Sequence, residues 1–549
     1  MGRRSSACVA VRCLASLAAL LVAVAARAGE DPAAIPSAQE LEASGAKIGK
    51  ITVVPGDVFD TSVEGEDGWL YRTANKLHIN TRPAVIRGQL LFEEGDPFSE
   101  RLLQETERNL RANPYLYDAS IVPVAYDGTT VDLEVRTRDT WTLNPGLNFS
   151  RTGGENEYAV QIQEKNLLGR GQEFQVEWES NVERTALTFL FADPHFLKSY
   201  TQLAIAYSDA DDGDTKYFRL QRPFYALDTR WSAGTTLSDS TFDTERWEYG
   251  KRVGRFQTEA QFYELAGGWS AGLRDGWVQR WTYGATYSES RYAPVPGYEL
   301  AGPLPPDQKY VYPWIGFELV EDAFQERENQ DQIRRTEDVL VGLSGWVRLG
   351  YAPEATGSEP DAVLLSAYVR DGADLNPRQS LFGSAWLSGR YENGEIVNGI
   401  LGAEARFYWT TSARSKFFGS VSGTTTEQLD ENQQLTLGGD TGLRGYPFAY
   451  QAGTSRALLT LEQRYYTKWY PFRLFHVAGA AFFDAGRTWG TDVTGAESFG
   501  LLKDVGIGLR LGSSRSAFGN VVHIDLAFPL DGEGDIDSVQ FVVETKGQF

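Results

Sequence analysis

From about residue 140 to residue 549, apolar and polar positions alternate in short runs, and clusters of Gly, Asp, Asn and Pro separate these runs. Successive side chains of a strand point to opposite faces, so each run predicts a strand with one apolar and one polar face. Three runs show this most clearly: Val339, Val341, Leu343, Gly345, Val347, Leu349 and Tyr351 against Ser344, Trp346 and Arg348; Val505, Ile507, Leu509 and Leu511 against Gly506, Gly508 and Arg510; and Val522, Ile524, Leu526 and Phe528 against His523 and Asp525. Beyond Trp141 the pattern predicts strands and no helix.

These strands predict a mainly β fold, an antiparallel transmembrane β-barrel whose apolar residues face lipid and whose polar residues face the lumen. A soluble β-sandwich or propeller also alternates and is the alternative fold. Dividing roughly 409 residues by about 25 residues per strand and loop predicts about 16 strands over residues 140–549. The proline-rich stretch 293–313 is expected to be a loop.

Residues 50–139 have a different pattern, which predicts one small α+β domain. A strand at 51–54 is followed by a helix at 83–91, capped by Thr81, and by a second helix at 99–113. Strands at 120–125 and 130–137 then flank Asp127-Gly128, a dipeptide that suits a tight two-residue turn. The second of these strands alternates between Val131, Leu133 and Val135 on one face and Asp132, Glu134 and Arg136 on the other.

The first 28 residues have the pattern of a secretory signal peptide. Arg3, Arg4 and Arg12 precede the apolar run 14–26, and a small-x-small site follows at Ala26-Arg27-Ala28. Residues 29–49 are expected to be a linker. Both cysteines of the chain, Cys8 and Cys13, lie in the segment that would be removed, so neither disulfides nor thiolate metal sites are expected.

The composition agrees with exported β structure and excludes some partners. The chain has 56 Gly, 29 Phe, 26 Tyr and 14 Trp beside one Met and four His. Its formal charge of -22 would become -26 without the four arginines of residues 1–28, and such a chain repels nucleic acid. The four histidines form no metal-ligand spacing, and no nucleotide-binding motif occurs, so no metal or cofactor is expected.

A glycine-rich segment at 437–446, L-G-G-D-T-G-L-R-G-Y, places one cation between two strand-like runs. Downstream, Phe482-Phe483-Asp484-Ala485-Gly486 lies in a strand whose residues His476, Ala478, Ala480, Phe482 and Asp484 share a face. An arginine in a partly dehydrated lumen needs a carboxylate, and its planar guanidinium can also stack on a ring.

With the small domain and the barrel, these motifs resemble the bacterial outer-membrane protein assembly factor superfamily, which includes BamA-like and TamA-like proteins. The resemblance implies that residues 50–139 are one POTRA module, and that Arg444, Gly445 and Tyr446 lie on a loop folded into the lumen. It also implies that Arg444 meets Phe482 and Asp484 there, beside Gly486, as a latch. Residues 166–171 and 192–196 resemble the first two turns of the family on the periplasmic side.

The two ends of the barrel carry further candidate residues. Pro145 and Gly146 would weaken the first strand, expected at 140–150, because one lacks a donor and the other a side chain. The chain ends with Phe541, Gly547 and Phe549 on one face, which resembles the carboxyl-terminal assembly signal of outer-membrane barrels. The resemblance implies a seam between first and last strands that opens sideways to pair with an incoming strand.

One catalytic pattern is present but lacks its context. Gly268-Trp269-Ser270-Ala271-Gly272 fits the G-x-S-x-G elbow of hydrolases, which requires a strand, a sharp turn and a helix. Barrel-like sequence surrounds it here, so we expect no enzyme activity, and an outer-membrane lipase is the enzyme alternative.

The sequence therefore predicts an outer-membrane barrel with a periplasmic amino-terminal domain that inserts or translocates polypeptides without a cofactor. Strand templating at the seam would be the mechanism. Its expected partners are outer-membrane lipid, unfolded outer-membrane or secreted polypeptides, and periplasmic chaperones or accessory factors. The alternatives are a two-partner secretion transporter and a passive diffusion porin.

Overall fold

The computed structural model describes residues 35–496, 498–517, 521–532 and 536–546. The predicted signal peptide and residues 29–34 of the predicted linker lie outside these residues. Gly547 and Phe549 also lie outside them. The chain divides into two compact units. The first unit comprises Met1–Thr52, Phe92–Leu103 and Ile121–Val135, and the second comprises the remaining residues.

The first unit is built on strands that the alternation predicts. Strands β1 (Lys47–Gly56), β3 (Thr130–Asp139) and β2 (Leu116–Tyr126) form a sheet in the order β1-β3-β2. Val131, Leu133 and Val135 of β3 are fully buried. The turn between β2 and β3 has three residues, 127–129, where two were expected, and Gly128 adopts a φ of 97° in it.

Between residue 35 and the barrel the structure contains four helices, and two of them were not predicted. Helix α2 (Ala38–Ala43) lies in the expected linker and is capped by Ser37. Helix α3 (Trp69–Leu77) follows, and then α4 (Pro83–Arg87) and α5 (Glu100–Arg111) lie within the two predicted helices. Thr81 does not cap α4, because its hydroxyl and amide both donate to Asp139. No helix among the described residues is long and apolar enough to cross a membrane.

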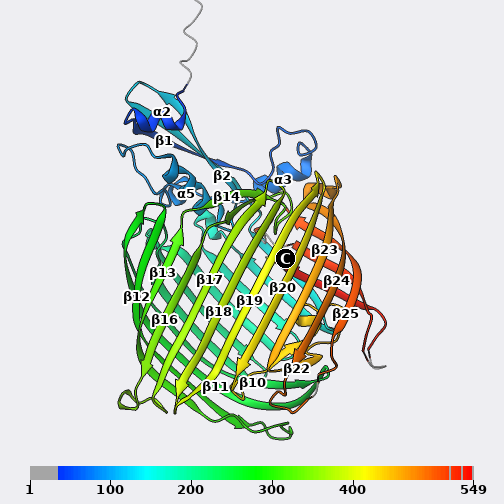
Figure 1. Cartoon of the computed structure of the whole chain (residues 1–549). Helices are drawn as coiled ribbons and strands as arrows, with labels where there is room; N and C mark the ends of the chain where they lie inside the picture. The colour runs from blue at the N-terminus through cyan, green and yellow to red at the C-terminus, as the bar shows by residue number, and fades with distance from the viewer. Residues whose placement is uncertain (1–34, 497, 518–520, 533–535, 547–549) are drawn as a thin grey trace, which may run out of the picture. The chain divides into compact units, whose positions relative to one another are not determined.

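The second unit contains a closed antiparallel barrel of 20 strands, which corrects the expected 16. Its first strands are β4 (Leu143–Thr152), β5 (Glu155–Glu164), β6 (Glu173–Ser180), β7 (Thr185–Phe196), β8 (Thr201–Ala210), β9 (Gly213–Arg222), β10 (Trp231–Glu248), β11 (Lys251–Arg274), β12 (Trp277–Pro294) and β13 (Gln308–Glu321). The others are β16 (Ser344–Ala352), β17 (Ala362–Asn376), β18 (Gln379–Glu392), β19 (Glu395–Ser412), β20 (Ser415–Glu427), β23 (Ser455–Tyr466), β24 (Phe475–Trp489), β25 (Leu502–Ser513), β26 (Val521–Pro529) and β27 (Gln540–Lys546). Figure 1 shows these strands inclined to the barrel axis.

Short strands and short turns explain the higher strand count. Strands β4 to β9 are 8 to 12 residues long. Turns such as 153–154, 249–250 and 275–276 connect neighbouring strands directly. An assumed repeat of about 25 residues was therefore too long.

Two-stranded sheets and single turns of 3-10 helix lie between the barrel strands. The hairpin β14 (Phe324–Glu328) and β15 (Thr336–Leu340) lies between β13 and β16, and β21 (Leu435–Leu437) pairs with β22 (Gln451–Gly453) between β20 and β23. The 3-10 turns are η1 (Leu167–Gly169), η2 (Glu354–Thr356), η3 (Gly439–Thr441) and η4 (Pro471–Arg473).

Barrel strands near the carboxyl end confirm the predicted faces. In β25 the side chains of Val505, Ile507 and Leu509 are exposed on the outside, whereas Arg510 is buried in the lumen. In β26 His523 and Asp525 are buried and Leu526 and Phe528 are exposed. Apolar residues thus cover the outer surface and charged ones gather inside.

Three expectations about element boundaries are wrong. Val339 belongs to β15, so the run from 339 to 351 is not one barrel strand. The proline-rich loop covers only 295–307, because β12 extends to Pro294 and Pro313 lies inside β13 opposite Ala285. Residues 192–196 end strand β7 instead of forming the turn that follows it.

The N-terminal rim, defined as the barrel end where β4 begins, is held to residues 78–82 of the same unit. Asp139 accepts hydrogen bonds from the Thr81 amide at 2.6 Å and from its hydroxyl at 3.0 Å, and lies 3.0 Å from His78 Nε2. The Asn166 amide then donates to the Thr81 hydroxyl at 2.9 Å. The family-like turn 166–171 thus anchors the segment that leads into the barrel.

Asp139→Ala is expected to destabilise this anchor by about 1–3 kcal/mol, because the buried Thr81 amide would lose its acceptor. Limited proteolysis should then cut residues 53–91 faster than in the parent protein. Asp537→Ala is the matched control, because Asp537 is exposed. Equal protection of both variants would contradict the anchor.

Candidate functional site: a latched loop beside a weak seam

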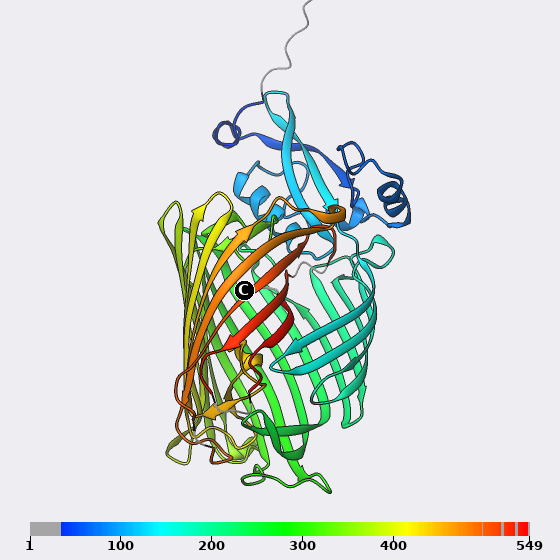
Figure 2. The same ribbon diagram turned by 90° about the vertical axis from the view of Figure 1, so that its right-hand side faces the viewer.

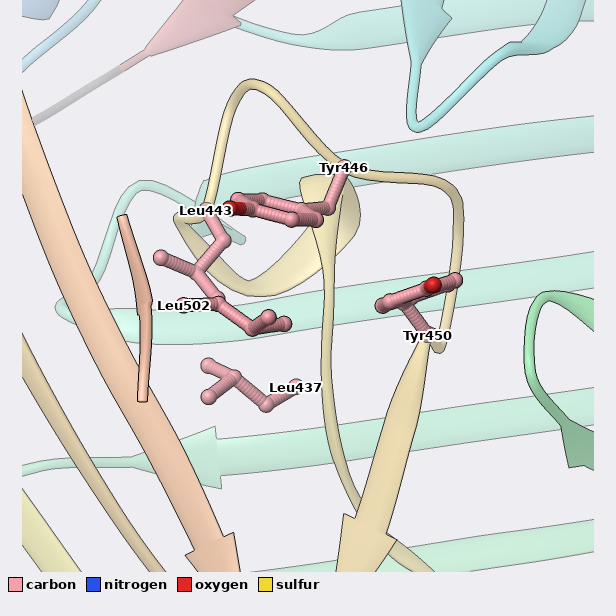
Figure 3. Close-up of a cluster of buried hydrophobic side chains, with 5 residues drawn as sticks. All are labelled: Leu437, Leu443, Tyr446, Tyr450 and Leu502. Carbon is pink, nitrogen blue, oxygen red and sulfur yellow. The ribbon is translucent and has the colours of Figure 1, made fainter. Parts of the chain in front are cut away.

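A loop at 438–450, called here the latch loop, carries the predicted Arg-Gly-Tyr motif. Its two ends are joined by β21 and β22, which pair Leu435 with Gly453 and Leu437 with Gln451. Three side chains of the loop, Leu443, Tyr446 and Tyr450, form a buried cluster with Leu437 and Leu502 (Figure 3). The loop is therefore packed like a core element and is not an ordinary surface hairpin.

Arg444 reaches the barrel wall from this loop and is 5% exposed. Its guanidinium makes a two-bond contact with Asp484, Nε to Oδ2 at 2.7 Å and Nη2 to Oδ1 at 3.0 Å. Its Nη1 donates to Glu462 at 3.0 Å and Asp525 at 3.3 Å, and its Cζ lies 3.4 Å from the centre of the Phe482 ring. Burial lowers the pKa of a guanidinium, but these carboxylates hold the pKa of Arg444 well above its usual value.

Further wall residues complete this network, and sequence reasoning did not assign them. Arg510 donates to Glu462 at 2.7 Å and to Asp525 at 2.5 Å, and Arg464 donates to Glu462 at 2.9 Å. Three guanidinium groups thus face three carboxylates, counting Arg444 and Asp484. Each buried guanidinium of this network thus has a carboxylate partner, which offsets the cost of burying its charge. The sequence pattern that could have identified Glu462 and Arg464 is the alternation along β23, which places both side chains on its inward face.

Two glycines provide the space that this network needs. A Cβ on Gly445 would lie 2.6 Å from the Cβ of Asp504, whose carboxylate accepts the Gly445 amide at 3.1 Å. A Cβ on Gly506 would lie 2.1 Å from the Phe482 ring. A larger residue at either position would push the loop or the ring out of place.

The remaining motif residues also contact the loop. Tyr446 is fully buried, and its hydroxyl lies 2.7 Å from the Lys503 carbonyl oxygen. A Cβ on Gly486 would lie 2.9 Å from the Leu437 side chain. The structure therefore brings together Arg444, Gly445, Tyr446, Phe482, Asp484 and Gly486, as the resemblance implies.

The barrel closes between its last and first strands through a short contact. Among the described residues, β27 and β4 share one ladder pair, Val543 with Arg151, while the Ser150 hydroxyl donates to the Val543 carbonyl oxygen at 3.0 Å. By comparison, β4 pairs with β5 from Leu143 to Thr152. Figure 2 faces the side where the red carboxyl-terminal strands approach the cyan first strands.

The predicted seam residues differ in their positions. Pro145 and Gly146 lie within β4, opposite Ile162 and Gln161 of β5. Phe541 is exposed on the outside of β27. The observed first strand is Leu143–Thr152 rather than 140–150, since Trp141 instead bridges to Ser516.

The latch loop also contacts the first hairpin, so it spans the seam. The Phe448 amide donates to the Gly153 carbonyl oxygen in the β4–β5 turn at 2.8 Å. On the other side of the seam, Arg444 binds β24 through Asp484 and β26 through Asp525. The loop thus ties the first strands to the last ones where the ladder itself is short.

The G-x-S-x-G motif lies in a strand of the barrel wall. Ser270 lies in β11 at a register shift, and its hydroxyl donates to the Gln279 carbonyl oxygen at 2.8 Å. The motif lies wholly inside β11, which ends at Arg274 and is followed by β12.

Comparisons with known proteins match part of this chain. Residues 389–546 match the model of the Omp85 superfamily domain, which covers the latch loop, Asp484 and the last strand. A Treponema pallidum (strain Nichols) protein named "Putative outer membrane protein assembly factor" is 29% identical over 148 residues, which are 25% of this chain and 17% of that protein.

Matches among solved structures include BamA from Haemophilus ducreyi lacking POTRA domains 1-3, with a TM-score of 0.37, 13% identity and coverage of 90% of this chain and 84% of that chain. CdiB from Acinetobacter baumannii has a TM-score of 0.45 and 12% identity, covering 91% of this chain and 73% of that chain. The chain thus matches the Omp85 superfamily domain over residues 389–546 and is similar over 148 residues to a protein named as a putative outer membrane protein assembly factor.

Proposed function

We propose that this protein inserts polypeptides into the outer membrane by pairing their strands with the edge of β4. The observation that carries the proposal is that, among the residues the structure describes, β27 and β4 share one ladder pair, Val543 with Arg151. An edge that lacks ladder partners presents free amide and carbonyl groups, which bind an extended chain by strand addition. No cofactor takes part, and the chemistry is an exchange of backbone hydrogen bonds.

The latch loop supports this function by controlling the seam. While Arg444 is bound to β24 and β26 and Phe448 to the β4–β5 turn, both sides of the seam are held together. An incoming strand would replace the short contact of β27 with a longer ladder.

The amino-terminal residues 50–139 serve as a POTRA module in this proposal. Their sheet β1-β3-β2 faces the periplasm and receives unfolded chains, with periplasmic chaperones or accessory factors as further partners. Outer-membrane lipid contacts the apolar residues exposed on the barrel exterior.

The test compares the outer-membrane proteome and the secreted proteins of depleted cells with those of parent cells. Broad loss of folded barrel proteins is expected if the seam inserts clients. Loss of one secreted protein with normal barrel proteins would instead indicate a two-partner secretion transporter. No change in either set would contradict polypeptide handling and favour a diffusion porin.

A further inference from the structure

The hairpin β14–β15, together with its flanking residues 322–343, occupies a position that the proposed function does not use. It connects β13 to β16 at the N-terminal rim, and β14 is labelled at this end of the barrel in Figure 1. Five pairs, from Phe324 with Leu340 to Glu328 with Thr336, hold it as a separate sheet. The other strand connections of this rim are shorter, such as 275–276 and 377–378.

The tip of this hairpin enters the lumen. Ile333 is 3% exposed and packs against Tyr466, Ala478 and Val521, which belong to β23, β24 and β26. A Cβ on Gly512 of β25 would lie 2.7 Å from the Ile333 Cβ. The tip is therefore packed as tightly against the wall as a core residue would be.

Polar contacts fix the tip on several sides of the lumen. Asp331 accepts from the Tyr408 hydroxyl of β19 at 2.8 Å, and the Gln330 carbonyl oxygen accepts from Arg464 of β23 at 3.2 Å. On the stem, Arg327 pairs with Asp374 of β17 at 2.7 Å. The hairpin thus bridges wall strands that lie far apart around the barrel.

The stem is bound by residues that precede the barrel in the same unit. Arg111 of α5 makes a two-bond contact with Asp338, at 2.8 Å and 2.6 Å, and also pairs with Glu326 at 2.7 Å. The Arg108 guanidinium lies 3.8 Å from the centre of the Phe324 ring. The Tyr117 hydroxyl donates to the Arg334 carbonyl oxygen at 2.7 Å. Movement of α5 would therefore pull on the hairpin.

We propose that the hairpin β14–β15 is a lumenal plug that α5 holds in place. Barrels of 16 to 18 strands enclose an aqueous channel, so 20 strands need a filling element to stay closed. Arg464 binds both the plug and Glu462 of the latch network, so the plug and Arg444 share one chain of contacts. This role concerns ion passage and does not depend on the proposed insertion activity.

Single-channel conductance of the full-length protein in planar bilayers tests the plug. Replacing residues 324–340 by about six Gly and Ser residues should raise the mean conductance at least about tenfold, because the lumen would fill with water. Arg111→Ala should increase the open fraction, whereas Arg291→Ala, at an exposed ion pair with Glu289, should not. An unchanged conductance in the shortened variant would overturn the proposal.

A disulfide lock keeps the test valid if the shortened variant fails to fold. Ile333→Cys with Gly512→Cys places two thiols side by side after a shift of about 1 Å, because disulfides need a Cβ separation of about 3.5–4.5 Å. In the Arg111→Ala background, the oxidised pair should hold the channel closed and reduction should open it. Equal conductance in both redox states, or failure of the pair to oxidise, would overturn the plug.

Discussion

Arg444→Ala should destabilise the folded barrel by about 3–5 kcal/mol, the cost of leaving buried carboxylates without their cation. Asp484 would lose two hydrogen bonds, and Glu462 and Asp525 would each lose one. The loop would detach from β24 and β26 while the strands stay exported. Heat-modifiable gel mobility should show unfolding at lower temperature, and insertion activity should fall with it.

Two further variants separate the network from a general surface effect. Arg444→Lys keeps the charge but cannot make the two-bond contact. The midpoint temperature of its unfolding should therefore lie between those of the parent protein and the alanine variant. Arg378→Ala removes an exposed arginine from a turn and should behave like the parent. Parental mobility and activity in Arg444→Ala would show that the loop needs no latch.

A disulfide across the seam should stop strand insertion almost completely. Arg151 and Val543 are direct partners in an antiparallel pair, and such Cβ atoms lie about 4.5–5.5 Å apart. Cysteines at both positions can therefore bond with little movement. Residues 35–549 contain no cysteine, so the introduced pair is unambiguous. Folded client proteins in the outer membrane should fall under oxidation and recover after reduction.

The matched control locks a seam that is not expected to open. Val522→Cys with Thr545→Cys joins β26 and β27, which already pair over the length of β27. Oxidation of this pair should leave insertion unchanged. Full activity of the locked β4–β27 variant would instead mean that clients leave through the lumen, which is the route of a secretion transporter.

Local patterns were sufficient to predict the strand class, the faces of β25 and β26, and the position of the family-like motifs. Alternation is a property of neighbouring residues, so it can be read without knowing the partners of a strand. The same reasoning placed Phe482 and Asp484 on one inward face. It could not reveal Arg510 or Asp525 as partners of the network, because their contacts join residues up to 81 positions apart.

The sequence by itself determined that this chain forms a β-barrel with an arginine loop, since periodicity and glycine placement act within a few residues. Only the tertiary structure decided the 20 strands, the one ladder pair that the described residues form across the seam, and the lumenal hairpin. Each of these depends on which strands become neighbours when the sheet closes, and that choice minimises exposed edges and unpaired charges over the whole barrel. Val339 shows the difference: its alternation is that of a barrel strand, yet it lies in β15, outside the closed sheet.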